Sequence, residues 1–232
     1  MRAMVLAAGV GSRLRPLTDA TPKALIDVGG ITMLERAIRA LRAAGADRIV
    51  VNAHHHAAAV DQFLRTRNWG VPVDVSREDD LLLDTGGGIL KAATLLNDGL
   101  PFLVYNVDIV TRLDLAALYR SHLARPCLAT LSVRDRAGSR RLVFDLDLNL
   151  RGREGEGGEG TPLAFDGIHV LSPEIFEKIT ERGVFSITAA YLRLAAAGER
   201  VRGFRSDAYP WAEIGTPERL ERVRRAVQQG EL

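Results

Sequence analysis

The sequence has little of three things, and each shortage excludes a class of protein. It has a single cysteine, Cys127, in an apolar strand-like run, so an internal disulfide is excluded and a reducing cytoplasm fits. No apolar run approaches membrane-spanning length, and the apolar residues 4–8 are too short for a signal peptide. The formal net charge is only +2 with both signs interleaved, so we expect small anions as partners rather than nucleic acid or a membrane.

What the sequence does have is enough apolar residues for one substantial core. Of its 232 residues, 47% are hydrophobic, which suits a single α/β domain over residues 1–232. In the first half, strand-like runs alternate with helical periodicity, a pattern typical of a parallel sheet with helices on both faces. The second half is richer in strands, so we predict a Rossmann-like mixed sheet that is mainly parallel.

The local patterns also place the elements. Predicted strands are 3–8, 48–52, 72–76, 101–106, 128–133, 141–147 and 163–171. Predicted helices are 32–44, one that carries Val60, Phe63 and Leu64, one from the glycine run at 86 through 96, then 113–123, 173–180, 186–197 and 217–228. The segment 151–160 has no apolar residue, so we predict a mobile hairpin tip there rather than a site.

The opening of the chain holds the most informative motif. An apolar strand runs into a turn that contains Gly9 and Gly11, where backbone N–H groups can converge on an anion without obstruction from side chains. Two cations, Arg13 and Lys23, follow within reach of the same loop. The pattern predicts a cradle for a triphosphate with added positive charge, although two glycines after a strand also form ordinary tight turns.

A competing interpretation of this turn is the dinucleotide fingerprint, because residues 9–11 begin like G-x-G-x-x-G. The third glycine position holds Leu14, and Pro16 behind it cannot continue a helix opened at the loop. The strand 48–52 also lacks the acidic residue that would hold a ribose. These departures disfavour a dinucleotide site.

A carboxylate follows another apolar strand. Asp108 lies just beyond the strand 101–106, and groups beyond the carboxyl ends of parallel strands face the ligand crevice of an open sheet. Because strand order commonly reverses beside the first strand, Asp108 and the Gly9 loop are expected to face each other. A carboxylate beside a phosphate cradle needs a cation between them, and Mg²⁺ is the usual one. The alternative is that Asp108 only caps a turn.

Two further clusters complete the set. Three successive glycines, 86–88, are costly at a helix entry, so either a planar base approaches their backbone or they form a flexible helix start capped by Asp84 or Thr85. Near the end of the chain, Thr216 begins a helix, and Glu213 just before it is free to be a second metal ligand.

In this order the clusters resemble the sugar-1-phosphate nucleotidyltransferases, over essentially the whole chain. The resemblance rests on Gly9-Val10-Gly11-Ser12-Arg13-Leu14-Arg15-Pro16-Leu17-Thr18, Pro22-Lys23, Thr85-Gly86-Gly87-Gly88, Asn106-Val107-Asp108, Phe165-Asp166-Gly167-Ile168, Pro173-Glu174-Ile175-Phe176 and Trp211-Ala212-Glu213-Ile214-Gly215-Thr216. It implies the nucleotide-diphospho-sugar transferase fold, with a nucleotide-binding half at 1–125 and a sugar-binding, closing half at 126–232. The chain looks most like bacterial N-acetylmuramate-1-phosphate uridylyltransferases, with mannose-1-phosphate guanylyltransferases second.

The resemblance also implies roles, in an enzyme that joins a nucleoside triphosphate to a sugar-1-phosphate and releases pyrophosphate. Arg13, Lys23 and Asp108 would be catalytic, and Asp108 with Glu213 would hold Mg²⁺. The nucleotide would contact Leu6, Ala8, Gly9, Gly11, Ser12, Arg13, Lys23, Gly86, Gly87 and Asn106, and the sugar Gly88, Gly167 and Glu213. The chain departs from the family at Val107, where glycine is usual, and at Glu213, where aspartate is usual.

Other functions remain open. A module that binds a nucleotide sugar without turnover is the alternative from another class, motivated only by Val107 and Glu213. Zinc at residues 54–56 is disfavoured because consecutive side chains diverge, and Ser12 lacks the partners of a nucleophile. We expect a monomer or a homodimer.

Overall fold

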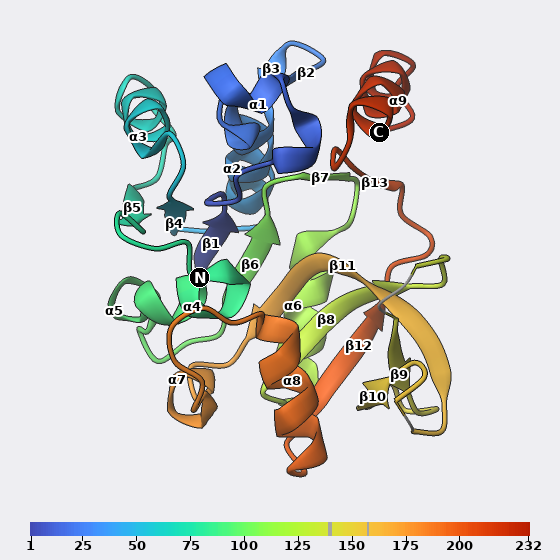
Figure 1. The fold of residues 1–232 in the computed structure, drawn as a ribbon. Coiled ribbons are helices and arrows are strands. Elements are labelled where there is room, and N and C mark those ends of the chain that lie inside the picture. The colour runs from blue at the N-terminus through green and yellow to red at the C-terminus, as the bar shows by residue number, and fades with distance from the viewer. Residues whose placement is uncertain (139–140, 157) are drawn as a thin grey trace.

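The fold is built on one large sheet with helices on both faces (Figure 1). This computed structural model describes residues 1–138, 141–156 and 158–232. The nine strands of the sheet are β1 (Arg2–Leu6), β4 (Arg48–Ala53), β5 (Val73–Arg77), β6 (Phe102–Asn106), β8 (Ala129–Arg134), β9 (Leu142–Phe144), β10 (Leu150–Arg153), β11 (Thr161–Leu171) and β12 (Val201–Arg205).

Two small sheets and the helices complete the molecule. The small sheets pair β2 (Asp27–Val28) with β3 (Ile31–Thr32), and β7 (Ile109–Thr111) with β13 (Trp211–Glu213). The helices are α1 (Leu17–Ala20), α2 (Met33–Ala43), α3 (Ala57–Arg65), α4 (Asp84–Lys91), α5 (Ala93–Leu96), α6 (Leu115–Ala124), α7 (Ile175–Lys178), α8 (Ile187–Ala196) and α9 (Pro217–Gln228), with 3-10 turns η1 (Ser12–Leu14) and η2 (Lys23–Leu25).

The sheet is mixed, with a parallel part in the order β6-β1-β4-β5. Because β1 pairs with β4 on one side and β6 on the other, the strand order reverses at β1, as the sequence predicts. β11 then runs antiparallel to β6 and carries β8 and β9, and the small β7–β13 sheet lies above the carboxyl end of β6 (Figure 1).

Alternating side chains along β1 divide the core into two layers. Ala3 and Val5 pack on one face beneath α2, α3, α6 and α9, whereas Met4 and Leu6 pack on the other beneath α4, α5, α7 and α8. Helices on both faces confirm the predicted α/β class. None of the helices in the described ranges combines the length and the apolar composition that crossing a bilayer requires.

The predicted strand 141–147 ends early. The Asp145 carboxylate accepts hydrogen bonds from the backbone N–H groups of Asp147 (3.0 Å) and Asn149 (2.8 Å), and Leu148 has a positive φ of 61°. This local turn stops β9 at Phe144 and returns the chain as β10. Residues 151–153 therefore belong to a strand rather than to a hairpin tip, and β9 lies between β10 and β11.

Several short elements are absent from the sequence-based prediction. β7, β12 and β13 pair with strands far away in the sequence, so no local periodicity marks them. The single helix predicted up to residue 96 is two helices, α4 and α5, divided at Ala92. Cys127 is buried as predicted but lies just before β8.

A histidine is enclosed near the end of β11. His169 is fully buried beside Phe165 and Tyr191, and neither of its ring nitrogens has a hydrogen-bond partner among the described residues. Burial lowers the pKa of His169 from 6.5 to about 3, because the charged ring would lose its hydration. The folded protein therefore keeps His169 neutral at a pH where the unfolded chain protonates it.

We predict a loss of stability in acid that depends on His169. As the pH falls from 6.5 toward 3, the His169 ring becomes protonated in the unfolded chain but stays neutral in the folded chain. The free energy of unfolding therefore falls. The contribution of this residue is about 1.4 kcal/mol per pH unit. Urea unfolding of wild type and His169→Leu between pH 7 and 4.5 measures it, and identical slopes in the two proteins would contradict the assignment.

Candidate active site

The loop after β1 is shaped by one glycine and one hydrogen bond to a neighbouring strand. The backbone N–H of Ala7 donates to Asn52 Oδ1 at 2.6 Å, which ends β1 at Leu6 rather than at the predicted residue 8. Gly11 has φ +69°, and a Cβ there would lie 2.9 Å from Thr18 Cγ2 and 3.2 Å from Lys23 Cβ. Only glycine fits this position, and the fit brings Lys23 back against the start of the loop.

The same loop exposes backbone donors. Among the hydrogen bonds between described residues, none uses the N–H groups of Gly9, Val10 or Gly11. Gly9 borders a cavity, and a Cβ on it would meet no atom within 4 Å. The loop therefore has the free N–H groups and open space that an anion cradle requires, as its glycines predict.

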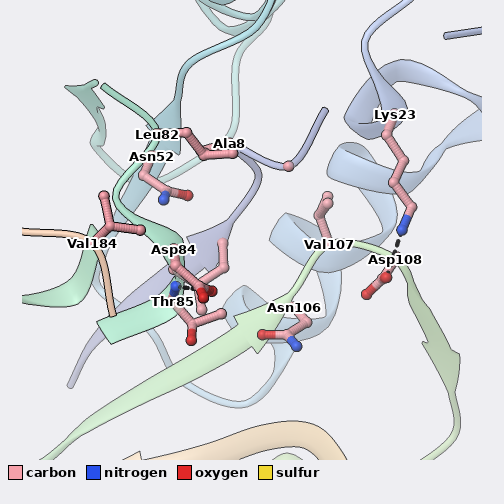
Figure 2. Close-up of a pocket in the computed structure, with 12 residues that line it drawn as sticks. Ala8, Lys23, Asn52, Leu82, Asp84, Thr85, Asn106, Val107, Asp108 and Val184 are labelled. Carbon is pink, nitrogen blue, oxygen red and sulfur yellow. Dashed lines mark hydrogen bonds and ion pairs between the residues drawn. The ribbon is translucent and has the colours of Figure 1, made fainter. Parts of the chain in front are cut away.

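The first cavity lies at the carboxyl ends of β1, β4 and β6 and has a volume of about 350 Å³ (Figure 2). Polar side chains of its wall come from the ends of neighbouring strands, Asn52 in β4 and Asn106 in β6, and from the start of α4, Asp84 and Thr85. The full lining is Leu6, Ala8, Gly9, Lys23, Asn52, Leu82, Asp84, Thr85, Asn106, Val107, Asp108 and Val184.

A cation and a carboxylate meet at the rim of this cavity. Lys23 Nζ lies 2.6 Å from Asp108 Oδ2, and both side chains are largely buried, with 12% and 23% of their surfaces exposed (Figure 2). Lys23 is held there by η2 and Asp108 by the turn between β6 and β7. The structure thus brings together the two residues that the sequence separates by most of the nucleotide-binding half.

The pairing of β7 with β13 brings Glu213 to the same place. Glu213 pairs with Ile109, and the N–H of Ile214 donates to the carbonyl of Asp108 at 3.0 Å. Glu213 forms an ion pair with Arg219 from the first turn of α9. Asp108 and Glu213 offer only carboxylate oxygens, and no group of three or more potential metal ligands occurs in the described part of the chain. A Mg²⁺ ion that also binds substrate phosphates suits such a pair.

Beyond Glu213 lies a second, larger cavity of about 800 Å³. It is strongly basic, and its lining is Arg13, Arg136, Gly138, Arg141, Leu142, Arg153, Ala164, Phe165, Ser186, Thr188, Ala189, Glu213 and Arg219. Arg13 therefore borders a different cavity from Lys23. A Cβ built on Gly215 would lie 3.1 Å from the Arg13 guanidinium and 3.3 Å from the Glu213 carboxylate, so these two side chains converge on Gly215.

The three glycines of α4 are crowded by the chain itself. A Cβ on Gly86 would lie 2.2 Å from the Phe185 ring, and one on Gly87 would lie 2.3 Å from the carbonyl oxygen of Gly183. A Cβ on Gly88 would lie 2.8 Å from the Asn52 amide. All three glycines are buried, and none lines either cavity. The groups that lie close to their backbone are therefore these neighbouring residues of the chain. The neighbouring Asp84 and Thr85 reach the first cavity instead.

Other sequence-predicted residues support the site without lining a cavity. Gly167 has φ +80°, and a Cβ there would lie 2.8 Å from the Asn106 amide, so this glycine lets β11 pack closely on Asn106. Gly11 and Ser12 lie in the loop but not at the cavity wall. Val107, by contrast, borders the first cavity, and it is 4% exposed and packs in the core.

Asn52 is the main residue that sequence reasoning missed. It is 2% exposed, accepts the Ala7 N–H and donates to Glu78 Oε1 at 2.7 Å, while it also lines the first cavity. A signal was present, because Asn52 ends an apolar parallel strand just as Asn106 does. Leu82 and Val184 come from loops whose position the sequence pattern does not indicate.

Comparison with known proteins agrees with this geometry. The family model described as nucleotidyl transferase matches residues 2–141. The chain belongs to the nucleotidyl transferase family. It is 36% identical to the N-acetylmuramate alpha-1-phosphate uridylyltransferase of Caulobacter vibrioides (93% of this chain, 92% of the relative) and 34% identical to that of Neisseria meningitidis (95% and 96%). A crystal structure of UDP-glucose pyrophosphorylase with UDP-glucose shares the fold, with a TM-score of 0.84 at 17% identity over 99% of this chain and 98% of that one.

The glycines of the site make a matched pair for a test. We expect Gly87→Ala to lower the free energy of unfolding by about 1–3 kcal/mol, because the new methyl group meets a backbone carbonyl and the clash outweighs the helix propensity of alanine. The methyl group added in Gly9→Ala meets open space, so this variant should keep the wild-type melting temperature. Its affinity for a nucleoside triphosphate should fall. Thermal unfolding and calorimetric titration measure both, and a fully stable Gly87→Ala would refute the packing role.

Proposed function

We propose that this chain joins a nucleoside triphosphate to a sugar-1-phosphate, with uridine triphosphate and N-acetylmuramate 1-phosphate as the substrates that fit best. The observation that carries the proposal is that Asp108 lines the first cavity together with Lys23, Glu213 lines the second together with Arg13, and the backbone beside Glu213 is hydrogen-bonded to Asp108. Two substrates that react through their phosphates need two neighbouring cavities of this kind. The names of the two bacterial relatives, which match this chain over more than nine-tenths of both lengths, favour this sugar and this base.

In this proposal the first cavity takes the nucleotide. Gly9 and its neighbours contact the phosphates through backbone N–H groups, and Lys23 adds charge at the same end. Asn52, Asn106 and Thr85 supply the hydrogen-bonding groups that orient the base and ribose. The second cavity takes the sugar-1-phosphate, with its phosphate toward Arg13 and Glu213.

The reaction is a direct substitution at phosphorus. An oxygen of the sugar phosphate forms a bond to the α-phosphorus, and the bond from that phosphorus to the oxygen bridging to the β-phosphate breaks, which releases pyrophosphate. The rate acceleration comes from alignment of the two substrates and from protein charges placed where the transition state accumulates charge. Lys23 neutralises charge on the triphosphate and the departing pyrophosphate, and Arg13 neutralises charge on the sugar phosphate, so no covalent intermediate on the protein is needed.

Asp108 and Glu213 would hold Mg²⁺ between the two cavities. Bound there, the ion would neutralise phosphate charge, which is the chemistry that phosphoryl transfer most needs. Glu213 has one methylene more than aspartate, and its carboxylate still belongs to the ligand class that Mg²⁺ prefers. The present partners of the two carboxylates, Lys23 and Arg219, are flexible cations that can turn toward phosphate oxygens instead.

The proposal is tested by measuring pyrophosphate release with four nucleoside triphosphates and a panel of sugar-1-phosphates. We expect the highest kcat/KM with uridine triphosphate and N-acetylmuramate 1-phosphate, and a loss on the order of a hundredfold or more in Lys23→Ala, as for other lost transition-state charges. Lys91→Ala, an exposed lysine on α4, is the matched control and should keep full activity. Preference for guanosine triphosphate and mannose 1-phosphate would change the assignment, and binding without turnover would identify a binding module.

Activity should also depend on a divalent cation and on Asp108. We expect no turnover after chelation, recovery on addition of Mg²⁺, and abolished turnover in Asp108→Asn with nearly unchanged thermal unfolding. Chelation leaves every side chain intact, so it separates the ion from the Lys23 pairing that Asp108→Asn also weakens. Full activity in chelator would show that no divalent ion acts at this pair.

A further inference from the structure

The basic second cavity has more positive charge than one phosphate requires. Of its five arginines, three pair with glutamates: Arg141 with Glu154, Arg153 with Glu156 and Arg219 with Glu213. Arg13 and Arg136 have no carboxylate partner among the residues that the structure describes. A ligand in the second cavity would therefore meet two guanidinium groups, those of Arg13 and Arg136, that no carboxylate among the described residues neutralises.

Arg136 is held over an indole ring. Its guanidinium carbon lies 4.4 Å from the centroid of Trp211, and its Nε is buried without a hydrogen-bond partner. Burial lowers the pKa of Arg136, so this side chain has already lost part of its hydration. Because stacking uses the face of a guanidinium, the N–H groups at its edge remain available for an anion.

The indole ring itself is fixed from behind. Trp211 Nε1 donates to the carbonyl of Asp166 at 3.1 Å, and Arg134 lies 5.4 Å from the centroid of the same ring. The Asp166 carboxylate is buried and accepts hydrogen bonds from Arg134 Nε at 2.9 Å and from Ser132 at 3.2 Å. Arg136 therefore rests on a support that is packed and hydrogen-bonded before any ligand arrives, which reduces the ordering cost of binding.

The place of Arg136 relative to the reacting groups follows from β13. Trp211 and Glu213 are two residues apart on one strand, so they lie on the same face, separated by roughly 7 Å. Glu213 and Arg13 mark the end of the cavity assigned to the sugar phosphate. Arg136, stacked on Trp211, lies further along this strand than Glu213 and is offset from the phosphate end of the cavity.

We propose that Arg136, stacked on Trp211, recognises a carboxylate carried by the sugar of the sugar-1-phosphate. This inference rests on the proposed function and names a specificity-determining residue for it. N-acetylmuramate bears a lactic acid ether on its third ring carbon, whereas N-acetylglucosamine has a hydroxyl group there and is otherwise the same sugar. A planar guanidinium with free edge donors fits such a carboxylate through two parallel hydrogen bonds.

The test compares these two sugars in four proteins. Calorimetric titration gives the Kd of N-acetylmuramate 1-phosphate and N-acetylglucosamine 1-phosphate for wild type, Arg136→Gln, Arg136→Lys and Arg120→Gln, and kcat/KM is measured alongside. Arg120 is an exposed arginine on α6 that lines neither cavity, so Arg120→Gln is the matched control. Thermal unfolding checks that each variant is folded.

We expect Arg136→Gln to weaken binding of the acidic sugar roughly ten- to hundredfold, the usual effect of a lost charged hydrogen bond, and to change the neutral sugar less than threefold. Arg136→Lys should recover only part of the loss, because a point charge cannot form the two parallel bonds. Arg120→Gln should behave as wild type.

Equal losses for both sugars in Arg136→Gln, or no loss for either, would overturn the assignment of Arg136. Tight, Arg136-dependent binding of the acidic sugar without any turnover would instead support the carboxylate subsite and reject the proposed transferase reaction. Failure of wild type to bind either sugar phosphate would reject both.

Discussion

The reversal of strand order at β1 is the constraint on which the rest of this structure depends. With β4 on one side of β1 and β6 on the other, the loops that leave these strands must diverge, and the space between them becomes a cavity. Residues at the ends of β1, β4 and β6 then face one another across this cavity. Position 11 in the loop after β1 has to be glycine, because Thr18 and Lys23 pack directly against it.

Charge balance explains why the carboxylates of the site are stable in the absence of a ligand. Asp108 and Glu213 are brought close by the β7–β13 pairing, and each has its own cation, Lys23 or Arg219. A partly buried carboxylate without a partner would be costly, so Lys23 and Arg219 stabilise the two carboxylates.

The sequence was sufficient for the architecture and for naming Gly9, Lys23 and Asp108, which the structure brings to one cavity, but not for what fills the space around them. Gly9, Lys23 and Asp108 are recognisable because anion binding and strand ends leave local signals. β7 and β13 leave none, since three-residue strands are stabilised only by each other. The glycines 86–88 show the limit most clearly: glycine predicts that something approaches the backbone, but sequence alone cannot say whether it is a ligand or, as at Gly87 and Gly183, the chain itself.

β11 connects the two cavities, and this gives the second half of the chain a role beyond closing the fold. Asp166 holds Trp211, and through it Arg136, on the side of the second cavity. The next residue, Gly167, packs on Asn106, which lines the first cavity. The register of β11 with β8 shifts between Phe165 and His169, so one irregular stretch of strand sets the position of groups in both cavities. Because Asp166 and Gly167 are successive residues of one strand, the irregularity fixes the distance between the two cavities more firmly than loops could, and a transfer reaction between two substrates requires such alignment.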